Sequence, residues 1–290
     1  MPANSLEPVE EIVAGLVDSH AHLDMADFNS DRAEVIARAR QNSVKWVLCP
    51  LDLCSEESLK NGLELRQKFS GIYLAAGVHP HQADRLSPEH LDSIKKLAEE
   101  KKILAIGEIG LDFYYNFSPE KKQMEAFSLQ LLLAAELGLP VIIHSRQAAG
   151  KIIEAIKSTG FKQRGILHCF TENRELARTM LDQGFLISFS GILTYRPAAY
   201  LREIASQLPV ETLLVETDAP YLTPWPEKKT WKRNEPALVV STARTLARLH
   251  NLSLEEMAEI TTNNFFRLFK LKKKLSGANI HHNATLPTKK

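Results

Sequence analysis

The stretch Gly15-Leu16-Val17-Asp18-Ser19-His20-Ala21-His22 is a short apolar run that ends in acidic and imidazole side chains. Four later runs share this pattern and end at Glu108, at His144, at His168, and at Glu216 with Asp218. A short run rich in β-branched residues or leucine is typical of a buried parallel strand whose C-terminal tip carries function. Five such tips with oxygen and nitrogen donors, and no thiolate cluster, predict one site assembled from many strands around more than one cation.

Strands and amphipathic helices are expected to alternate along the chain. Three further strands, at residues 46–51, 72–78 and 185–189, bring the expected number to eight. Helices are expected at 31–42, 55–69, from Ser87-Pro88 onward, from Ser118-Pro119 to Gly138, and at 147–158, 173–183, 197–207 and 235–250. This alternation predicts an α/β TIM (β/α)8 barrel, whose catalytic groups cluster at the C-terminal ends of the strands. Ser253-Leu254-Glu255-Glu256 is a capping box that predicts an additional C-terminal helix to about Lys270.

The ends of the chain differ from the predicted barrel at 15–270. Residues 1–14 are expected to be a flexible N-terminal extension. Residues 271–290 are basic and poor in apolar side chains, so we expect a disordered tail in which His281-His282 is solvated.

The amino-acid composition restricts the cellular location and the binding partners that we expect for this protein. A net charge of +1 gives no overall field to attract nucleic acid, so DNA must be met by local patches. The three cysteines are too few and too unevenly placed for a disulfide framework, which favours a reducing compartment and a cytoplasmic location. No stretch has the length of a membrane span and the N-terminus lacks a secretory signal, so we expect no membrane partner. We expect a monomer.

The spacing of the candidate ligands indicates how they point. Residues two apart on a strand face the same way, so His20 and His22 face the barrel interior together, as do Glu216 and Asp218. An isolated pair of interior histidines is more often satisfied by hydrogen bonds than by a metal ion. With Glu108, His144 and His168 on the same face, burial would cost several kcal/mol for each ionisable group unless divalent cations compensated it.

Seven motifs resemble those of the TatD family of metal-dependent deoxyribonucleases, in the amidohydrolase-like superfamily. The resemblance covers about residues 15–270 and implies a TIM barrel, a centre of two or three metals, and hydrolysis of DNA phosphodiesters, often as a 3′–5′ exonuclease. The motifs are Asp18-Ser19-His20-Ala21-His22-Leu23-Asp24, Gly77-Val78-His79-Pro80-His81, Gly107-Glu108-Ile109-Gly110-Leu111-Asp112, His144-Ser145-Arg146, His168-Cys169-Phe170, Glu216-Thr217-Asp218-Ala219-Pro220-Tyr221-Leu222 and Arg233-Asn234-Glu235-Pro236.

The resemblance also implies a role for each ligand. One metal would be held by His20, His22 and Asp218. The other would be held by His144 and His168, with Glu108 bridging the two. Imidazole and carboxylate donors accept Mg, Mn, Zn or Ni.

Three carboxylates are the candidate catalytic groups. Asp218 is expected to accept the proton of the attacking water, because it can touch both metal and nucleophile. Glu108 would bridge the metals. Glu216 would position water, complete a third metal site, or only support another ligand.

The candidate substrate-binding residues are His79, Arg146, Arg233 and Asn234. His79 could bind a phosphate, cap the site or hold an extra metal; with His81 it could instead stabilise the loop around Pro80. Arg146 is expected to bind phosphate bidentately, the alternative being a pair with a helix carboxylate. The stretch 225–234 alternates aromatic and basic side chains, which predicts a grip on single-stranded DNA; packed tryptophans and solvated lysines are the alternative.

Three functions remain open. The first is cleavage of single-stranded or damaged DNA, as in DNA repair. The second is a deacylase or esterase acting on a nucleic-acid-linked carbonyl such as D-aminoacyl-tRNA, because a binuclear centre polarises a carbonyl as readily as a phosphoryl group. The third is a non-catalytic binding barrel, which the intact ligand set disfavours.

Overall fold

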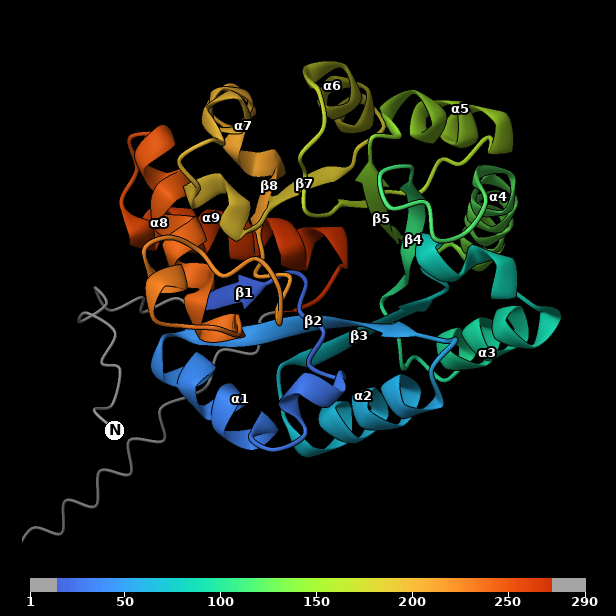
Figure 1. Ribbon diagram of the computed structural model, residues 1–290, viewed down its shortest axis with the longest axis horizontal. Coiled ribbons are helices and arrows are strands. Elements are labelled where there is room, and N and C mark those ends of the chain that lie inside the picture. Colours follow the sequence, from blue (N-terminus) through green and yellow to red (C-terminus); the bar gives the residue numbers. More distant parts are fainter. Residues whose placement is uncertain (1–14, 273–290) are drawn as a thin grey trace, which may run out of the picture.

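The computed structural model describes residues 15–272, and it contains eight parallel strands hydrogen-bonded in sequence order (Figure 1). The predicted TIM barrel is therefore confirmed, and each predicted strand is present. The expectations for residues 1–14 and for the tail beyond residue 272, His281-His282 included, lie outside the described residues. The strands are β1 (Leu16–Asp18), β2 (Val44–Asp52), β3 (Ile72–Gly77), β4 (Ala105–Asp112), β5 (Val141–Arg146), β6 (Gly165–Leu167), β7 (Leu186–Phe189) and β8 (Leu213–Val215).

The barrel closes through backbone hydrogen bonds just beyond the ends of β1 and β8. Ser19 N donates to Val215 O at 3.0 Å, and Asp218 N donates to His20 O at 2.9 Å. Ala21 and Ala219 form a parallel bridge in the same segment. This closure brings the first and last predicted ligand pairs together although almost two hundred residues separate them.

The helices surround the strands (Figure 1). They are α1 (Arg32–Gln41), α2 (Glu56–Lys68), α3 (Pro88–Glu99), α4 (Glu120–Leu137), α5 (Ala149–Thr159), α6 (Arg174–Asp182), α7 (Ala199–Ala205), α8 (Val239–Leu249) and α9 (Leu254–Leu268). Their predicted boundaries differ by a few residues; for example, Pro236–Leu238 forms a separate 3-10 turn before α8. Within residues 15–272, no helix combines the length and the apolar character needed to cross a bilayer.

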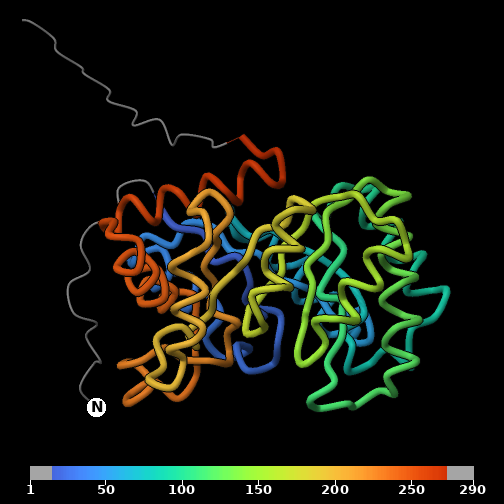
Figure 2. Tube along the Cα trace, turned by 90° about the horizontal axis from the view of Figure 1, so that it is seen from above, coloured from blue at the N-terminus to red at the C-terminus, as the bar shows by residue number. Residues whose placement is uncertain are grey.

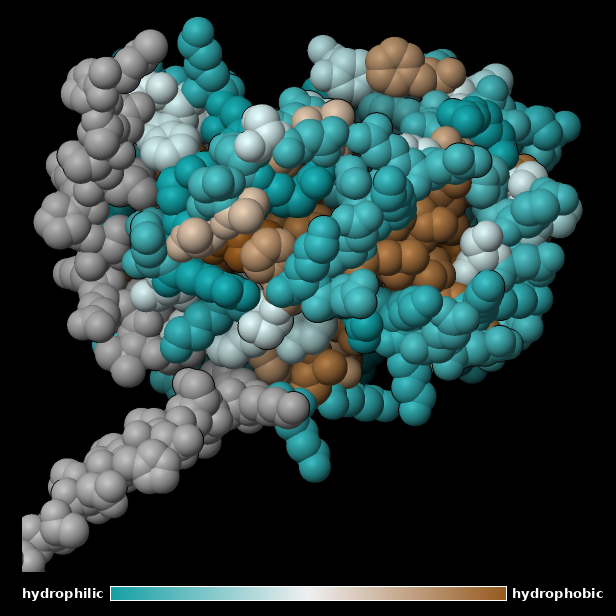
Figure 3. All heavy atoms as spheres, turned by 90° about the horizontal axis from the view of Figure 1, so that it is seen from below, coloured by the Kyte–Doolittle hydropathy of each residue, from teal (hydrophilic) through white to brown (hydrophobic). Residues whose placement is uncertain are grey.

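The outer surface agrees with the amphipathic pattern of these helices. Figure 3 shows a face covered mainly by hydrophilic side chains, with apolar atoms in the hollows between them. On this face the helices turn polar side chains to solvent, as the amphipathic pattern predicts.

Helix α9, red in Figure 2, packs against β1 and β8 and fills the N-terminal end of the barrel. Its Phe265, Phe266 and Leu268 join a buried apolar cluster with one residue from each strand, namely Val17, Leu48, Ala75, Ala105, Ile142, Ile166, Leu186 and Leu214. The Thr262 hydroxyl accepts the Val17 N–H and donates to Gly15 O, both at 3.2 Å. The predicted capping box of Ser253 and Glu256 is present. The barrel is therefore closed at this end.

Strand β4 has an irregularity where its ligand lies. Ile106 pairs with Val141 but Ile109 pairs with Ile143, so β4 carries one extra residue between the two pairs. A bulge of this kind re-aims a side chain, here that of Glu108. Gly110 follows with φ +142°, and a Cβ there would lie 2.0 Å from His144 O. Only glycine permits this close approach of β4 and β5.

Candidate metal centre

A cavity of about 860 Å³ opens at the C-terminal ends of the strands. Its lining includes most of the predicted ligands, namely His22, His79, Glu108, His144, His168 and Asp218. His20 is fully buried behind them. Burial of so many titratable groups in one place is unusual in a folded protein and marks a functional centre.

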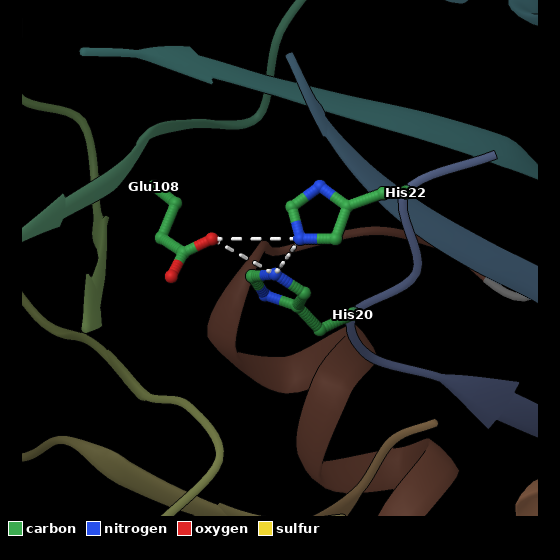
Figure 4. Close-up of side chains that lie close together, drawn as sticks. All are labelled: His20, His22 and Glu108. Carbon is green, nitrogen blue, oxygen red and sulfur yellow. Dashed lines mark hydrogen bonds and ion pairs between the residues drawn. The ribbon is translucent and has the colours of Figure 1, made fainter. Parts of the chain in front are cut away.

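One oxygen of Glu108 faces the two histidines that follow β1. Glu108 Oε2 lies 3.2 Å from Nε2 of His20 and 3.7 Å from Nε2 of His22. The two Nε2 atoms lie 3.2 Å apart, and both rings point toward the same carboxylate oxygen (Figure 4).

The other oxygen of Glu108 faces three different imidazoles. Glu108 Oε1 lies 2.7 Å from His168 Nε2, 2.9 Å from His144 Nδ1 and 3.2 Å from His79 Nε2. Glu108 therefore stands between two imidazole groups with one oxygen toward each, the arrangement required of a bridging ligand.

Asp218 completes the group around His20 and His22. Its Oδ1 lies 3.5 Å from His22 Nε2 and 4.0 Å from His20 Nε2. The Asp218 backbone has φ 56°, a left-handed conformation that few residues except glycine, asparagine and aspartate adopt. Such backbone strain is common at functional sites.

The donors fit divalent cations. Three sets of ligand atoms lie within 4.8 Å of one another in the described chain: His20-His22-Glu108, His20-His168-Asp218 and His79-Glu108-His144. All are imidazole nitrogens or carboxylate oxygens, as zinc, manganese, nickel and magnesium accept. Two buried atoms here, His20 Nδ1 and Glu216 Oε2, have no hydrogen-bond partner among the described residues. Such atoms are costly unless a further group satisfies them.

The centre also favours positive charge. Burial opposes ionisation of Glu108, but the surrounding imidazoles, His168 first among them, hold its pKa well below its usual range. Burial opposes protonation of His22, but Asp218 and Glu108 raise its pKa to about 9. Protons on these rings occupy the places that metal ions would take, so metal binding should release protons.

His79 lies closer to the centre than its predicted role as a phosphate-binding residue suggests. Burial lowers its pKa to about 4, so the ring is neutral, and its Nδ1 accepts the His81 N–H at 3.1 Å. His79 joins Glu108 and His144 in one of the candidate ligand sets, and its Nε2 lies 3.2 Å from Glu108 Oε1. Of the roles open to His79 from the sequence, the extra metal ligand is compatible with this set, and the bond from His81 also stabilises the loop around Pro80.

Glu216 is fully buried and does not line the cavity. Its Oε1 accepts the Cys169 N–H at 2.8 Å and lies 3.3 Å from His168 Nδ1. Of the roles expected for Glu216, this position favours support of another ligand, while water positioning and a third metal site stay predictions. Its contacts orient His168, as carboxylates commonly do for metal-binding histidines.

Two supporting carboxylates were missed from the sequence. Asp112 Oδ2 lies 3.1 Å from His144 Nε2 and 2.9 Å from His81 Nε2. Asp18 accepts hydrogen bonds from the N–H and hydroxyl groups of Thr217, at 2.9 and 2.6 Å. Burial raises the pKa of Asp18 to about 8 despite these bonds. Both lie inside quoted motifs at strand ends, the signal that could have identified them.

The predicted substrate-binding residues separate into two groups. Arg146 lines the cavity, and its Cζ lies 4.2 Å from the centre of the Tyr114 ring instead of pairing with a helix carboxylate. Arg233 and Asn234 do not line the cavity. Arg233 Nη2 pairs with Asp31 Oδ2 at 2.7 Å.

Asn234 requires a correction. Its side chain is fully buried, and its amide donates to Thr217 O at 2.9 Å and to Tyr221 O at 2.6 Å. Direct contact with substrate is excluded by this burial. Asn234 instead fixes the backbone on both sides of Asp218.

The geometry agrees with the family resemblance, and comparison with known proteins decides it. Residues 17–270 match the family described as TatD related DNase. This chain belongs to the TatD family. Its relatives include YabD of Bacillus subtilis, an uncharacterized metal-dependent hydrolase, which is 39% identical over 88% of this chain and 99% of that protein. YcfH of Escherichia coli K12, named in the same way, is 40% identical over 88% of this chain and 95% of that protein.

Two further TatD relatives are informative. The Klebsiella pneumoniae protein named 3′-5′ ssDNA/RNA exonuclease TatD is 37% identical over 88% of this chain and 97% of that protein. The crystal structure of YJJV, a TatD homolog from Escherichia coli, superposes with a TM-score of 0.81 at 28% identity and covers 89% of this chain and 98% of that one. The protein is thus a member of a family of metal-dependent hydrolases with the barrel described above.

Proposed function

We propose that this protein hydrolyses DNA phosphodiester bonds with two or three divalent cations, as a 3′–5′ exodeoxyribonuclease on single-stranded or damaged DNA. One observation carries the proposal: Glu108 directs one oxygen to His20 and the other to His144 and His168. A carboxylate shared in this way suits a pair of cations, and paired cations suit phosphoryl transfer. The name of the Klebsiella relative supports a nucleic-acid substrate.

The ligands follow from the three donor sets. One cation would be held by His20, His22 and Asp218, and the other by His144, His168 and His79, with Glu108 between them. Bound there, divalent cations lower the pKa of water, neutralise the non-bridging phosphate oxygens and stabilise the leaving alkoxide. The identity of the ion depends on availability, since these donors accept Mg, Mn, Zn or Ni.

The residues of the chain then divide the remaining work. Asp218 lines the cavity and accepts the proton of the attacking water at a carboxylate oxygen. Burial opposes its ionisation, but His22 and His20 lower its pKa, so the carboxylate is in the basic form at neutral pH. Glu216 and Asp112 keep His168 and His144 in place.

Arg146 is suited to bind the phosphate beside the scissile one. It lines the cavity, and its guanidinium is anchored against aromatic rings, which leaves its planar donors available for a phosphate. We expect the protein to act as a monomer.

A substrate comparison tests the proposal. Purified protein loaded in turn with Mg, Mn, Zn or Ni is given 3′-labelled and 5′-labelled single-stranded DNA, duplex DNA and D-aminoacyl-tRNA. Stepwise loss of nucleotides from the 3′ end with at least one metal is expected, and Glu108→Gln should abolish it. Release of amino acid from tRNA without cleavage of DNA would instead establish the deacylase.

A further inference from the structure

The loop after β4 exposes aromatic rings at the cavity. Tyr114, Tyr115 and Phe117 are 54%, 49% and 68% exposed, and Tyr115 lines the cavity itself. Adjacent exposed aromatic side chains are unfavourable in water and mark a surface that another molecule covers. None of the roles assigned to the metal centre uses these rings.

The rings are ordered among themselves. Those of Tyr115 and Phe117 are nearly parallel, with centroids 5.5 Å apart and an angle of 3° between the planes. Tyr114 meets Tyr115 edge-on, with centroids 4.9 Å apart. The Arg146 guanidinium lies over both tyrosines, at 4.2 and 4.6 Å. The loop therefore presents a preformed aromatic surface with a cation beside it.

Contacts of His81 and Asp112 connect this surface to the metal centre. The His81 ring lies edge-on against Phe117 at 4.8 Å, and its Nε2 meets Asp112 Oδ2 at 2.9 Å. The other oxygen, Asp112 Oδ1, accepts the backbone N–H groups of Tyr114 and Tyr115 at 3.0 and 2.9 Å. The carboxylate beside His144 thus also holds the start of the loop.

The charges around the cavity favour binding of a nucleic-acid strand on the side where Arg146 and these rings lie. Among the described residues that line it, Arg146 is the only permanent cation, whereas Asp24, Asp27, Asp52 and Glu57 add negative charge outside the metal centre. A polyanion is repelled by those carboxylates and attracted to Arg146. A strand whose phosphate lies at Arg146 brings a base against the rings that the same guanidinium covers.

We propose that Tyr114, Tyr115 and Phe117 form a stacking site for a nucleobase adjacent to the scissile phosphate. This inference rests on the proposed nuclease function and specifies how the strand is held. Stacking accepts any base, because each has a π-face, so the site would position the strand without selecting sequence. No residue of the stretch 225–234 lines the cavity, whereas Tyr115 does, so this stretch lies apart from the proposed stacking site.

An abasic scan tests the stacking site. Single-stranded oligonucleotides carry one abasic residue, moved stepwise through the nucleotides nearest the cleaved linkage, and kcat/KM is measured for each. With the wild-type protein, an abasic residue at one of these positions should lower kcat/KM roughly tenfold, as expected when one stacked base is removed. In the double variant Tyr115→Ala/Phe117→Ala, kcat/KM for the intact strand should be roughly tenfold lower than in wild type. An abasic residue at that same position should then lower the kcat/KM of the double variant hardly any further.

Two variants serve as controls. Tyr115→Phe keeps a ring and should retain the abasic effect. Tyr200→Ala removes a ring that is 54% exposed on α7 but does not line the cavity, and it should behave as wild type. The melting temperature of each variant reports on folding.

Three results would overturn the inference. Equal cleavage of intact and abasic strands by wild type would remove the stacking site and leave the nuclease function standing. An equal loss in the double variant on an intact oligonucleotide and on a fully abasic strand, which has no ring to stack, would show that the loop supports the metal centre instead. Absence of cleavage of every oligonucleotide with every metal would refute the nuclease function, and the stacking site with it.

Discussion

Asp112 Oδ2 lies 3.1 Å from Nε2 of His144, while Nδ1 of the same ring faces Glu108 at 2.9 Å. A carboxylate behind a metal-binding imidazole fixes its orientation and raises its basicity. Asp112→Asn should therefore lower metal affinity about 10- to 100-fold and leave the barrel folded. Competition with a chelator measures the affinity and circular dichroism the fold. Unchanged affinity would mean that Asp112 holds only the loop.

Asp218 and Glu216 should differ although they lie two residues apart. Asp218→Asn removes the proposed proton acceptor, so kcat at saturating metal should fall about 10²- to 10⁴-fold. Glu216→Gln loosens His168, so it should weaken metal binding about 10- to 100-fold, and excess metal should restore most of kcat. If excess metal does not rescue Glu216→Gln, Glu216 takes part in the chemistry itself.

Arg146 should matter for both its charge and its planar shape. Arg146→Ala should raise KM for single-stranded DNA about tenfold and flatten its dependence on salt by about one unit of slope. Arg146→Lys keeps the charge but not the flat contact with Tyr114, so it should recover the salt slope more than the affinity. Arg174→Ala, which removes an exposed cation paired with Glu203, is the matched control. An equal effect of both alanine variants would refute a specific contact.

Asp31 provides a test of stability against pH. Hydrogen bonds from Arg233 and Arg38 lower its pKa below the ordinary 3.8. A lowered folded-state pKa stabilises the fold above the unfolded-state pKa and loses this contribution as the pH falls through the folded-state value. Asp31→Asn should thus reduce the free energy of unfolding by less than about 1 kcal/mol at neutral pH, because solvent screens these partly exposed ion pairs, and the difference should shrink below about pH 4. Urea titrations of both proteins across this range measure it; a difference independent of pH would exclude the ion pairs as its source.

The sequence predicted the barrel because its strands are apolar runs and its helices carry apolar stripes, and both patterns are local. It also predicted that Glu108, His144 and His168 meet, because the ends of parallel strands share one face. The residues that surround these ligands were harder to predict from the sequence. The ion pair of Arg233 with Asp31 joins residues 202 positions apart, which no spacing reveals. Likewise, the sequence shows that the segment 113–117 is rich in aromatic residues. Whether this loop turns toward the cavity depends on the surrounding packing, which the sequence does not show.

The apolar cluster that contains Phe265 and Phe266 closes the N-terminal end of the barrel, opposite the cavity. A strand therefore cannot thread through the barrel, as it does through enzymes with an open channel. If the proposed nuclease function holds, the end of the strand would enter and each released nucleotide would leave at the same end of the barrel, so departure of product would precede the next advance of the strand. On a long substrate, the pace of digestion would then be set by exchange at this end of the barrel, and a chain end would enter more readily than an interior segment.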